Sequence, residues 1–308
     1  MLYLKLVLTA VFWGGTFVAG RVLSQEVPPF SAALLRFLTA SGLLVPFLCL
    51  ARGGLPRLTR RQAAAVSLLG LTGVFAYNAF FFAGLKTVPA SRASLIIANN
   101  PVFIALFSSL AFRERLRASQ VAGIALSVCG ALVVIARGDP AALLSGGVHR
   151  GDLYILGCVA SWVAYSLIGK IALTDLPPLV AVTYACLIGA VFLAVPAGLE
   201  GVHHLALQLS PAAWVCILYL GGLGTALGFI WYYQGIRAVG PSRAGVFINF
   251  VPVSGVLLAY LLLGETLDGS LWAGAALVIG GTWLTNRARG VHPPGVRPTV
   301  PASPSTRG

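Results

Sequence analysis

The sequence predicts an all-α integral membrane protein with ten transmembrane helices, arranged as two inverted five-helix repeats. Three observations predict this fold. Of the 308 residues, 58% are hydrophobic and only 9% are charged, too few charges to cover a soluble globule of this length. Apolar stretches of about 20 residues recur, long enough to cross the roughly 30 Å hydrocarbon layer as helices. The two halves of the chain also match each other in sequence.

Each apolar stretch is expected to form one spanning helix. The stretches are too long, and too rich in Gly, Ala and Leu, for the strands of a transmembrane barrel. The first continues from Met1 at full spanning length, so we interpret it as a helix rather than a cleavable signal peptide. The predicted spans are residues 2–23, 30–50, 63–86, 90–112, 118–136, 151–173, 178–199, 211–236, 241–263 and 270–286.

The basic residues predict the orientation in the membrane. A formal net charge of +13 would suit nucleic acid, but the arginines lie in short connections between apolar spans, so no nucleic-acid partner is expected. With the N-terminus inside, fifteen Lys and Arg residues fall on the cytoplasmic side and five on the other. The positive-inside rule therefore favours a multi-pass protein with both termini in the cytoplasm.

A second copy of the first half begins about 150 residues later. Trp13 matches Trp162 at a separation of 149, and the separation settles at 151, where Gly84 matches Gly235. Further matched pairs are Pro28-Pro29 with Pro177-Pro178, Pro46 with Pro196, Ser91-Arg92-Ala93 with Ser242-Arg243-Ala244, Pro101 with Pro252, Glu114 with Glu265, Gly123 with Gly274 and Gly130 with Gly281. The glycine pairs lie seven residues apart on one helix face, which favours close helix packing.

The two repeats are expected to have opposite membrane orientations. Each holds five helices, so the second copy must enter the membrane from the other face. The connection Arg113-Glu114-Arg115-Leu116-Arg117 is basic, whereas its counterpart Gly264-Glu265-Thr266-Leu267-Asp268 is acidic, as expected for opposite sides. We place the repeats at residues 1–137 and 151–286. The remaining tail, 287–308, is rich in Pro, Ser, Thr and Gly and is expected to be disordered and cytoplasmic.

Four short motifs carry a resemblance to a known family. They are Phe12-Trp13-Gly14-Gly15-Thr16 in the first helix, Leu35-Arg36-Phe37 in the second, Gly84-Leu85 through Ala93 before the fourth, and Gly264-Glu265-Thr266 after the ninth. In the order and spacing of these motifs, the chain resembles the drug/metabolite transporter superfamily, specifically its EamA-type ten-helix exporters, over residues 2–286. The resemblance implies a bundle of helices around a central cavity, and the export of amino acids, other metabolites or drugs across a bacterial inner (plasma) membrane, without naming the cargo.

No catalytic or metal-binding set is expected within the bundle. All Asp, Glu and His residues fall in loops or at helix ends. An intramembrane enzyme would need an acid, a base or metal ligands among the helices, so we expect no enzyme, no catalytic residue, no metal and no cofactor. The same pattern argues against a proton relay of intramembrane carboxylates.

Arg36 is the candidate charge of the cavity. It lies six residues beyond Phe30, roughly 9 Å along the second helix at 1.5 Å per residue. Two positions remain open for its side chain. The long stem either snorkels to the membrane interface, or the guanidinium faces the cavity, where an anionic or zwitterionic substrate group would suit it.

Paired interruptions mark the fourth and ninth helices. Pro101 is expected about 18 Å into its helix, near the midplane, and Pro252 at the same depth in the other repeat, each kinking its helix. Corresponding interruptions of this kind point to a transporter binding site. Asn99, Asn100 and Asn249 lie beside them, either lining the cavity or bonding to neighbouring helices.

Large aromatic and amide side chains complete the candidate site. Tyr77 and Asn78 in the third helix, and Tyr232 in the eighth, combine broad faces with hydrogen-bonding groups that stack and orient a ligand. Trp13 and Trp162 are paired by the repeat and are expected on the cavity wall or in a shared structural position. Trp231 and Tyr233 belong either to the cavity or to an interfacial aromatic belt.

Two functions remain open from the sequence. The first is a secondary transporter that exports small metabolites or drugs by alternating access, with a small-molecule substrate and membrane lipid as its partners. The alternative is a channel or lipid-moving membrane protein of the same fold. The sequence does not specify the coupling ion or the oligomeric state.

Overall fold

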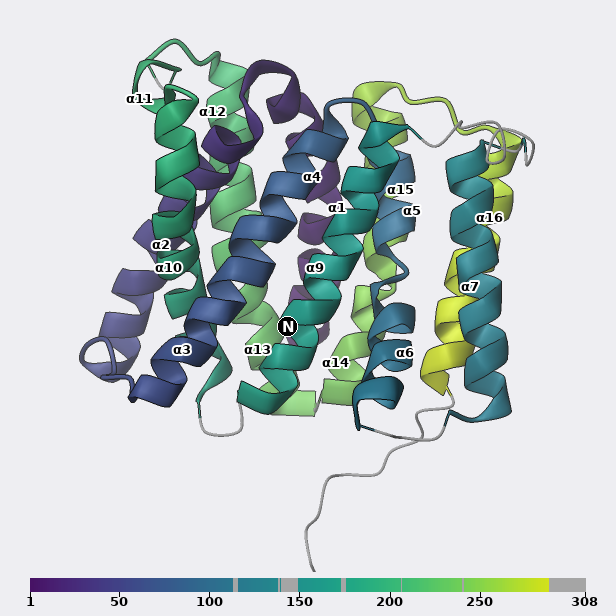
Figure 1. The fold of residues 1–308 in the computed structure, drawn as a ribbon, viewed down its shortest axis with the longest axis horizontal. Coiled ribbons are helices and arrows are strands. Elements are labelled where there is room, and N and C mark those ends of the chain that lie inside the picture. Colours follow the sequence, from purple (N-terminus) through teal and green to yellow (C-terminus); the bar gives the residue numbers. More distant parts are fainter. Residues whose placement is uncertain are drawn as a thin grey trace, which may run out of the picture.

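The protein is a bundle of helices that lie along one common direction (Figure 1). The computed structural model describes residues 1–112, 116–137, 139, 149–172, 176–205, 207–239 and 241–287. Its helices are α1 (Leu2–Glu26), α2 (Pro29–Arg52), α3 (Arg60–Leu69), η1 (Gly70–Ala76), α4 (Tyr77–Leu85), α5 (Ala90–Ile97), α6 (Asn100–Phe112), α7 (Ala118–Ala136), α9 (Arg150–Ala172), α10 (Pro178–Leu199), α11 (Val202–Leu205), α12 (Pro211–Leu218), η2 (Tyr219–Leu227), α13 (Gly228–Val239), α14 (Pro241–Ile248), α15 (Phe250–Leu263) and α16 (Gly269–Arg287). The predicted tail after Arg287 lies outside the described residues.

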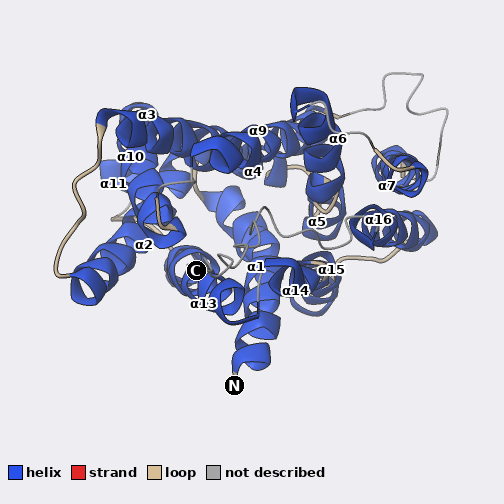
Figure 2. Ribbon diagram, turned by 90° about the horizontal axis from the view of Figure 1, so that it is seen from below, coloured by secondary structure: helices blue, strands red, loops and turns tan. Residues whose placement is uncertain are grey.

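Nine helices within the described residues are long and apolar enough to cross a membrane. They are Leu2–Glu26, Pro29–Arg52, Arg60–Leu85, Ala90–Ala111, Ala118–Ala136, Arg150–Lys170, Pro178–Leu199, Pro211–Val239 and Ala244–Leu263. The 19-residue α16 is less apolar, but it lies along α7 at one end of the bundle (Figure 2). With α16 as the tenth, the predicted all-helical fold of two five-helix repeats is confirmed.

Local sequence explains where the helices begin and end. Pro29 and Pro178 occupy the first turn of α2 and α10, where a missing backbone donor costs nothing. Thr59 caps α3 through a capping box with Gln62. Gly264 ends α15 in the left-handed conformation, with φ 64°, which glycine adopts without a steric penalty.

Glycines bring α7 and α16 into close contact. A Cβ on Gly123 would lie 2.7 Å from the carbonyl oxygen of Gly281, and one on Gly130 would lie 2.9 Å from that of Gly274. Lipid tails are as apolar as leucine, so helices in membranes associate by such close backbone packing rather than by burial from water. The matched glycines therefore have the packing role that the sequence predicts.

The two repeats make equivalent contacts across their interface. A Cβ on Gly70 would meet the carbonyl oxygen of Ala185 at 3.0 Å, and one on Gly221 would meet the carbonyl oxygen of Arg36 at 2.6 Å. Gly70 and Gly221 are 151 residues apart and Arg36 and Ala185 are 149 apart, the same separations as in the sequence repeat. The second helix of each repeat thus packs against the third helix of the other repeat.

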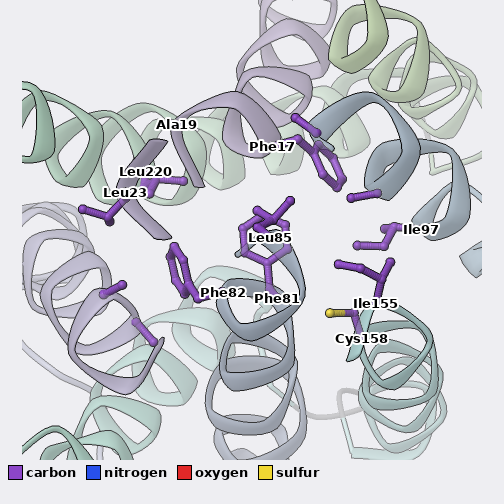
Figure 3. Close-up of a cluster of buried hydrophobic side chains, with 14 of the residues drawn as sticks. Phe17, Ala19, Leu23, Phe81, Phe82, Leu85, Ile97, Ile155, Cys158 and Leu220 are labelled. Carbon is purple, nitrogen blue, oxygen red and sulfur yellow. The ribbon is translucent and has the colours of Figure 1, made fainter. Parts of the chain in front are cut away.

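A buried aromatic and aliphatic core holds α1, α4 and α9 together (Figure 3). Phe81 and Phe82 of α4 are 1% and 0% exposed, and Phe17 of α1 packs edge-to-face on Phe81 with ring centroids 5.6 Å apart. Ile155 and Cys158 of α9 close the same cluster. This packing fixes the positions of three helices whose other side chains line a cavity.

Candidate functional site

A cavity of about 510 Å³ lies at the interface of the two repeats, within the size range of small-molecule sites. Its wall includes residues of α1, α2, η1, α4, α5, α6, α9, α10, η2, α13, α14, α15 and α16. Every residue predicted for the site lies on this wall except Asn99. These residues are Trp13, Arg36, Tyr77, Asn78, Asn100, Pro101, Trp162, Tyr232, Asn249 and Pro252.

Arg36 lies on the cavity wall rather than at the membrane interface. Its Nε donates to Thr225 Oγ1 at 3.2 Å and its Nη1 donates to Asn78 Oδ1 at 3.0 Å. The guanidinium lies 5.3 Å from the centre of the Phe37 ring. Nη2 has no hydrogen-bond partner among the described residues. Two neutral oxygens hold the charge in place without neutralising it.

Asn78 and Thr225 are themselves fixed by unusual backbone. Both side chains reach carbonyls of the π-helical segments η1 and η2: Asn78 Nδ2 donates to Val74 O at 2.8 Å, and Thr225 Oγ1 donates to Leu220 O at 2.8 Å. Such π-helical segments leave carbonyls free for side chains and often occur at functional sites. The wider turns therefore position the groups that hold Arg36.

One aromatic group on the wall joins α1 to α13. The Trp13 ring lies 5.2 Å from Tyr232 and 5.6 Å from Phe229, between centroids, and Tyr233 continues the group. Trp13 Nε1 donates to the Gly224 carbonyl at 2.9 Å, which fixes the indole against η2. Tyr233 thus belongs to the cavity, whereas Trp231 packs on Phe12 away from it.

The second aromatic group repeats this arrangement with the halves exchanged. Trp162 of α9 lies 5.4 Å from Tyr77 of α4 and 5.0 Å from Tyr165, between ring centroids. In both groups, the tryptophan of one repeat packs on a tyrosine from the third span of the other. The hydroxyls of Tyr77 and Tyr165 have no hydrogen-bond partner among the described residues, and both side chains face the cavity.

The structure corrects the placement of Asn99. Its side chain is 0% exposed and points away from the cavity: Nδ2 donates to the Leu95 carbonyl at 3.1 Å, and Oδ1 accepts from Ser127 Oγ at 2.7 Å. Asn99 therefore ties the end of α5 to α7, as interhelical polar residues do in membranes. Of the three asparagines beside the helix breaks, Asn100 and Asn249 line the wall.

The prolines begin new helices rather than kink continuous ones. Pro101 is the second residue of α6 and Pro252 the third of α15, and α5 and α14 end just before them. Proline is tolerated in a first turn because its missing N–H has no intrahelical partner there. The two breaks place the positive ends of α6 and α15 beside the cavity, as in discontinuous transporter helices.

We expect Pro101→Ala and Pro252→Ala to slow turnover several-fold while membrane insertion stays normal. Alanine restores a donor and allows the two half-helices to join, which opposes any motion that hinges at the break. Initial transport rates per mole of reconstituted protein, with expression level as the control, measure the effect. Unchanged rates in both variants would rule out a hinge role.

Several wall residues were not predicted from the sequence. Thr225, Tyr165 and Phe229 lie on the wall, and Thr225 contacts Arg36 directly. The only available signal was the pair of matched glycines Gly73 and Gly224, which mark the two π-helical segments. Nothing in the local sequence distinguishes Thr225 from a threonine that packs against lipid.

The described cavity wall contains one cation, Arg36, and no Asp, Glu or His. Carboxylates instead bind helix starts across the repeat interface, on the face predicted to be outside. These contacts join Glu26 to Ser210, Glu200 to Ser31 and Glu265 to Ser91. Each carboxylate also accepts a backbone N–H of the serine it contacts, as anionic groups do at helix N-termini. Glu114, the counterpart of Glu265, lies outside the described residues.

Arg92 and Asp268 form an ion pair on the same face. Partial burial raises the pKa of Asp268, but hydrogen bonds from Ser270 and Leu271 and the charge of Arg92 outweigh it and hold the pKa below the usual value. A lowered carboxyl pKa contributes stability to the folded state at pH values above the ordinary pKa. That stability is lost as the pH falls through the lowered pKa. This contact therefore stays charged through the neutral range.

A membrane-spanning bundle of two inverted repeats, with an aromatic and polar cavity between them, is the architecture of a membrane transporter. The chain belongs to the EamA-like transporter family, which matches residues 1–136 and again residues 149–287. The names of the family and of its members describe transporters rather than enzymes.

Three relatives span nearly the whole chain. The chain is 29% identical to "Uncharacterized transporter YyaM" of Bacillus subtilis, over 90% of this chain and 91% of the relative. It is 33% identical to a "Probable terminal-alkyne amino-acid exporter" of Streptantibioticus cattleyicolor, over 92% of each chain. It is 32% identical to a "Probable amino-acid metabolite efflux pump" of Salmonella typhimurium, over 90% and 92%.

A solved crystal structure shares the fold. The TM-score is 0.60 at 24% identity, over 92% of this chain and 97% of the other. At that identity the likeness concerns the fold alone.

Proposed function

We propose that this protein is a secondary transporter that exports small metabolites, namely amino acids or related compounds, or drugs, across a bacterial inner membrane by alternating access. The observation that carries the proposal is the cavity whose wall comes from both repeats. Inverted repeats allow the two halves to exchange conformations and so expose a central site to each side in turn. The exporter and efflux names of two relatives support the direction of transport.

Counterflow in proteoliposomes tests this function. A panel of amino acids, nucleosides and cationic drugs, first screened for protection of cells that overproduce the protein, supplies the substrate. A carrier gives saturable uptake that is accelerated by substrate on the opposite side. Flux that rises linearly with concentration would identify a channel instead, and transfer of labelled phospholipid between leaflets would identify a lipid-moving protein.

Exchange is expected to continue when the proton gradient is collapsed. The described cavity wall has no carboxylate or histidine to carry a proton. Counterflow measured with and without a protonophore should therefore differ by less than about twofold. Accumulation that requires an imposed pH gradient would contradict this expectation, and coupling would then run through loop acids such as Glu265 or through the substrate.

The orientation is tested by accessibility. Tags at either terminus should be protected in intact cells, and a tag within residues 138–147 should be reached by an impermeant label. Apart from Asp139, these loop residues lie outside the described part of the chain. Labelling of a terminus and the loop from the same side would contradict the proposed inner location of both termini.

A further inference from the structure

We propose that the substrate is an amphipathic organic monoanion: a carboxylate on an apolar, planar body, without an ammonium group. The inference rests on the proposed function, since it names the substrate class of the same cavity. Three features carry it: a polar cluster on the wall with unused donors, apolar groups at the positions equivalent by repeat symmetry, and a wall without a negative charge.

The polar cluster consists of Arg36, Asn78 and Thr225, which are joined by hydrogen bonds. A guanidinium has five N–H donors, and the described protein groups accept only two of them. A carboxylate accepts two parallel bonds from such a group and neutralises its charge. A buried cation without a counter-ion is costly, so binding an anion here removes a penalty that the empty site carries.

Apolar residues occupy the positions that the inverted repeat makes equivalent to this polar cluster. The matched contacts of Gly70 with Ala185 and of Gly221 with Arg36 make Ala185 the counterpart of Arg36.

The separation of 151 makes Phe229 the counterpart of Asn78, and Val74 that of Thr225. All three counterparts line the cavity. Each polar group is thus matched by an apolar group at its symmetry-equivalent position, so the repeat symmetry supplies no second polar cluster for the rest of the ligand.

The charge of the wall selects against an ammonium group. Arg36 is the one cation on the described wall, and no acid faces it. An ammonium beside Arg36 would meet a like charge in a medium of low dielectric constant and would find no carboxylate to replace its water. A carboxylate meets an opposite charge, so net monoanions are favoured over zwitterions and over cations.

The body of the ligand is recognised by the two aromatic groups. Trp13 with Tyr232, and Trp162 with Tyr77, face the cavity, and each pair joins a residue of one repeat to a residue of the other. Rings of this kind pack on planar apolar groups in offset or edge-to-face geometry. An aryl or other flat hydrocarbon body fits such a wall better than a compact sugar or a polar chain.

Three related probes test the proposal on the purified wild-type protein by isothermal titration calorimetry. Phenylalanine has both charged groups, 3-phenylpropanoate lacks only the ammonium, and phenethylamine lacks only the carboxylate. We expect 3-phenylpropanoate to bind at least about tenfold more tightly than phenylalanine, and phenethylamine to bind most weakly. Tighter binding of either amine, or no measurable binding of 3-phenylpropanoate up to millimolar concentration, overturns the proposal.

Two matched variants locate the anion site. Arg36→Gln is expected to weaken 3-phenylpropanoate binding about 30-fold or more, because a buried charge loses its partner. Arg52→Gln, on the same helix at an exposed position, should leave the affinity unchanged. Equal affinities of the two variants would overturn the assignment. If Arg36→Gln fails to give monodisperse protein, the order of the three probes on the wild type decides.

Counterflow of labelled 3-phenylpropanoate separates the two proposals. Binding in the expected order without counterflow would refute the transporter function while the ligand class stands. Saturable counterflow of other compounds, with no binding of 3-phenylpropanoate, would refute the ligand class while the function stands.

Discussion

Gly281→Val is expected to prevent stable folding, whereas Gly280→Val is expected to be tolerated. A Cβ at position 281 would lie 2.4 Å from the Ser127 backbone nitrogen and 2.6 Å from the Gly123 carbonyl oxygen, so α7 and α16 must separate. At position 280 the nearest atom is the end of the Leu126 side chain, 3.8 Å away. We expect the first change to cost about 3 kcal/mol or more.

The yield of monodisperse protein and its thermal unfolding in detergent measure this difference. The adjacent glycine is a matched control, because both variants add the same side chain to the same helix. Ser127 also donates to Asn99, so separation of α7 from α16 would disturb the break between α5 and α6 as well. Similar unfolding temperatures for the two variants would show that the close packing of α7 against α16 is not a rigid contact.

Asn78→Asp is expected to abolish binding and transport of anionic substrates while the protein remains folded. The two side chains have nearly the same shape, and Asn78 Oδ1 already accepts from Arg36 at 3.0 Å. The new carboxylate would form a permanent ion pair with Arg36 and satisfy its charge from within the protein. The substrate carboxylate would then meet a neutral pair instead of a free cation.

We expect Asn78→Asp to bind 3-phenylpropanoate at least about 30-fold more weakly than the wild type does, a loss close to that of Arg36→Gln. Asn78→Leu is the control, since it removes the hydrogen bond without adding a charge and should retain more of the anion affinity. Titration of the wild type, Asn78→Asp and Asn78→Leu with 3-phenylpropanoate measures the three affinities to be compared. Stronger anion binding by Asn78→Asp than by Asn78→Leu would show that the charge of Arg36 does not attract the substrate.

The architecture and the positions of the helix breaks follow from the sequence. The length and spacing of the apolar stretches predict the helices, because only a helix satisfies its backbone within the hydrocarbon layer. The drifting separation of 149 to 151 predicts the two repeats, and the contacts of Gly70 and Gly221 repeat it in three dimensions. Proline at equivalent depths predicts the interruptions, since proline cannot continue the hydrogen bonds of a preceding turn.

The tertiary structure alone decided which side chains face the cavity. Asn99 and Asn100 are neighbours, yet Asn99 lies in the turn after α5 and contacts Ser127, whereas Asn100 begins α6 and lines the cavity. In a soluble protein the polar face of a helix would reveal which side chains point to the interior. In a membrane helix the lipid-facing and protein-facing sides are equally apolar, so the sequence lacks that signal.

The environment of Arg36 was likewise decided by packing between distant segments. The sequence left its side chain between the interface and the cavity, because both positions suit a long charged stem. Its partners, Asn78 and Thr225, lie 42 and 189 residues away, and they reach it only because α2 packs against α4 and η2. The sequence alone determined the membrane fold and its symmetry, whereas tertiary packing decided where that symmetry is broken by a single charge.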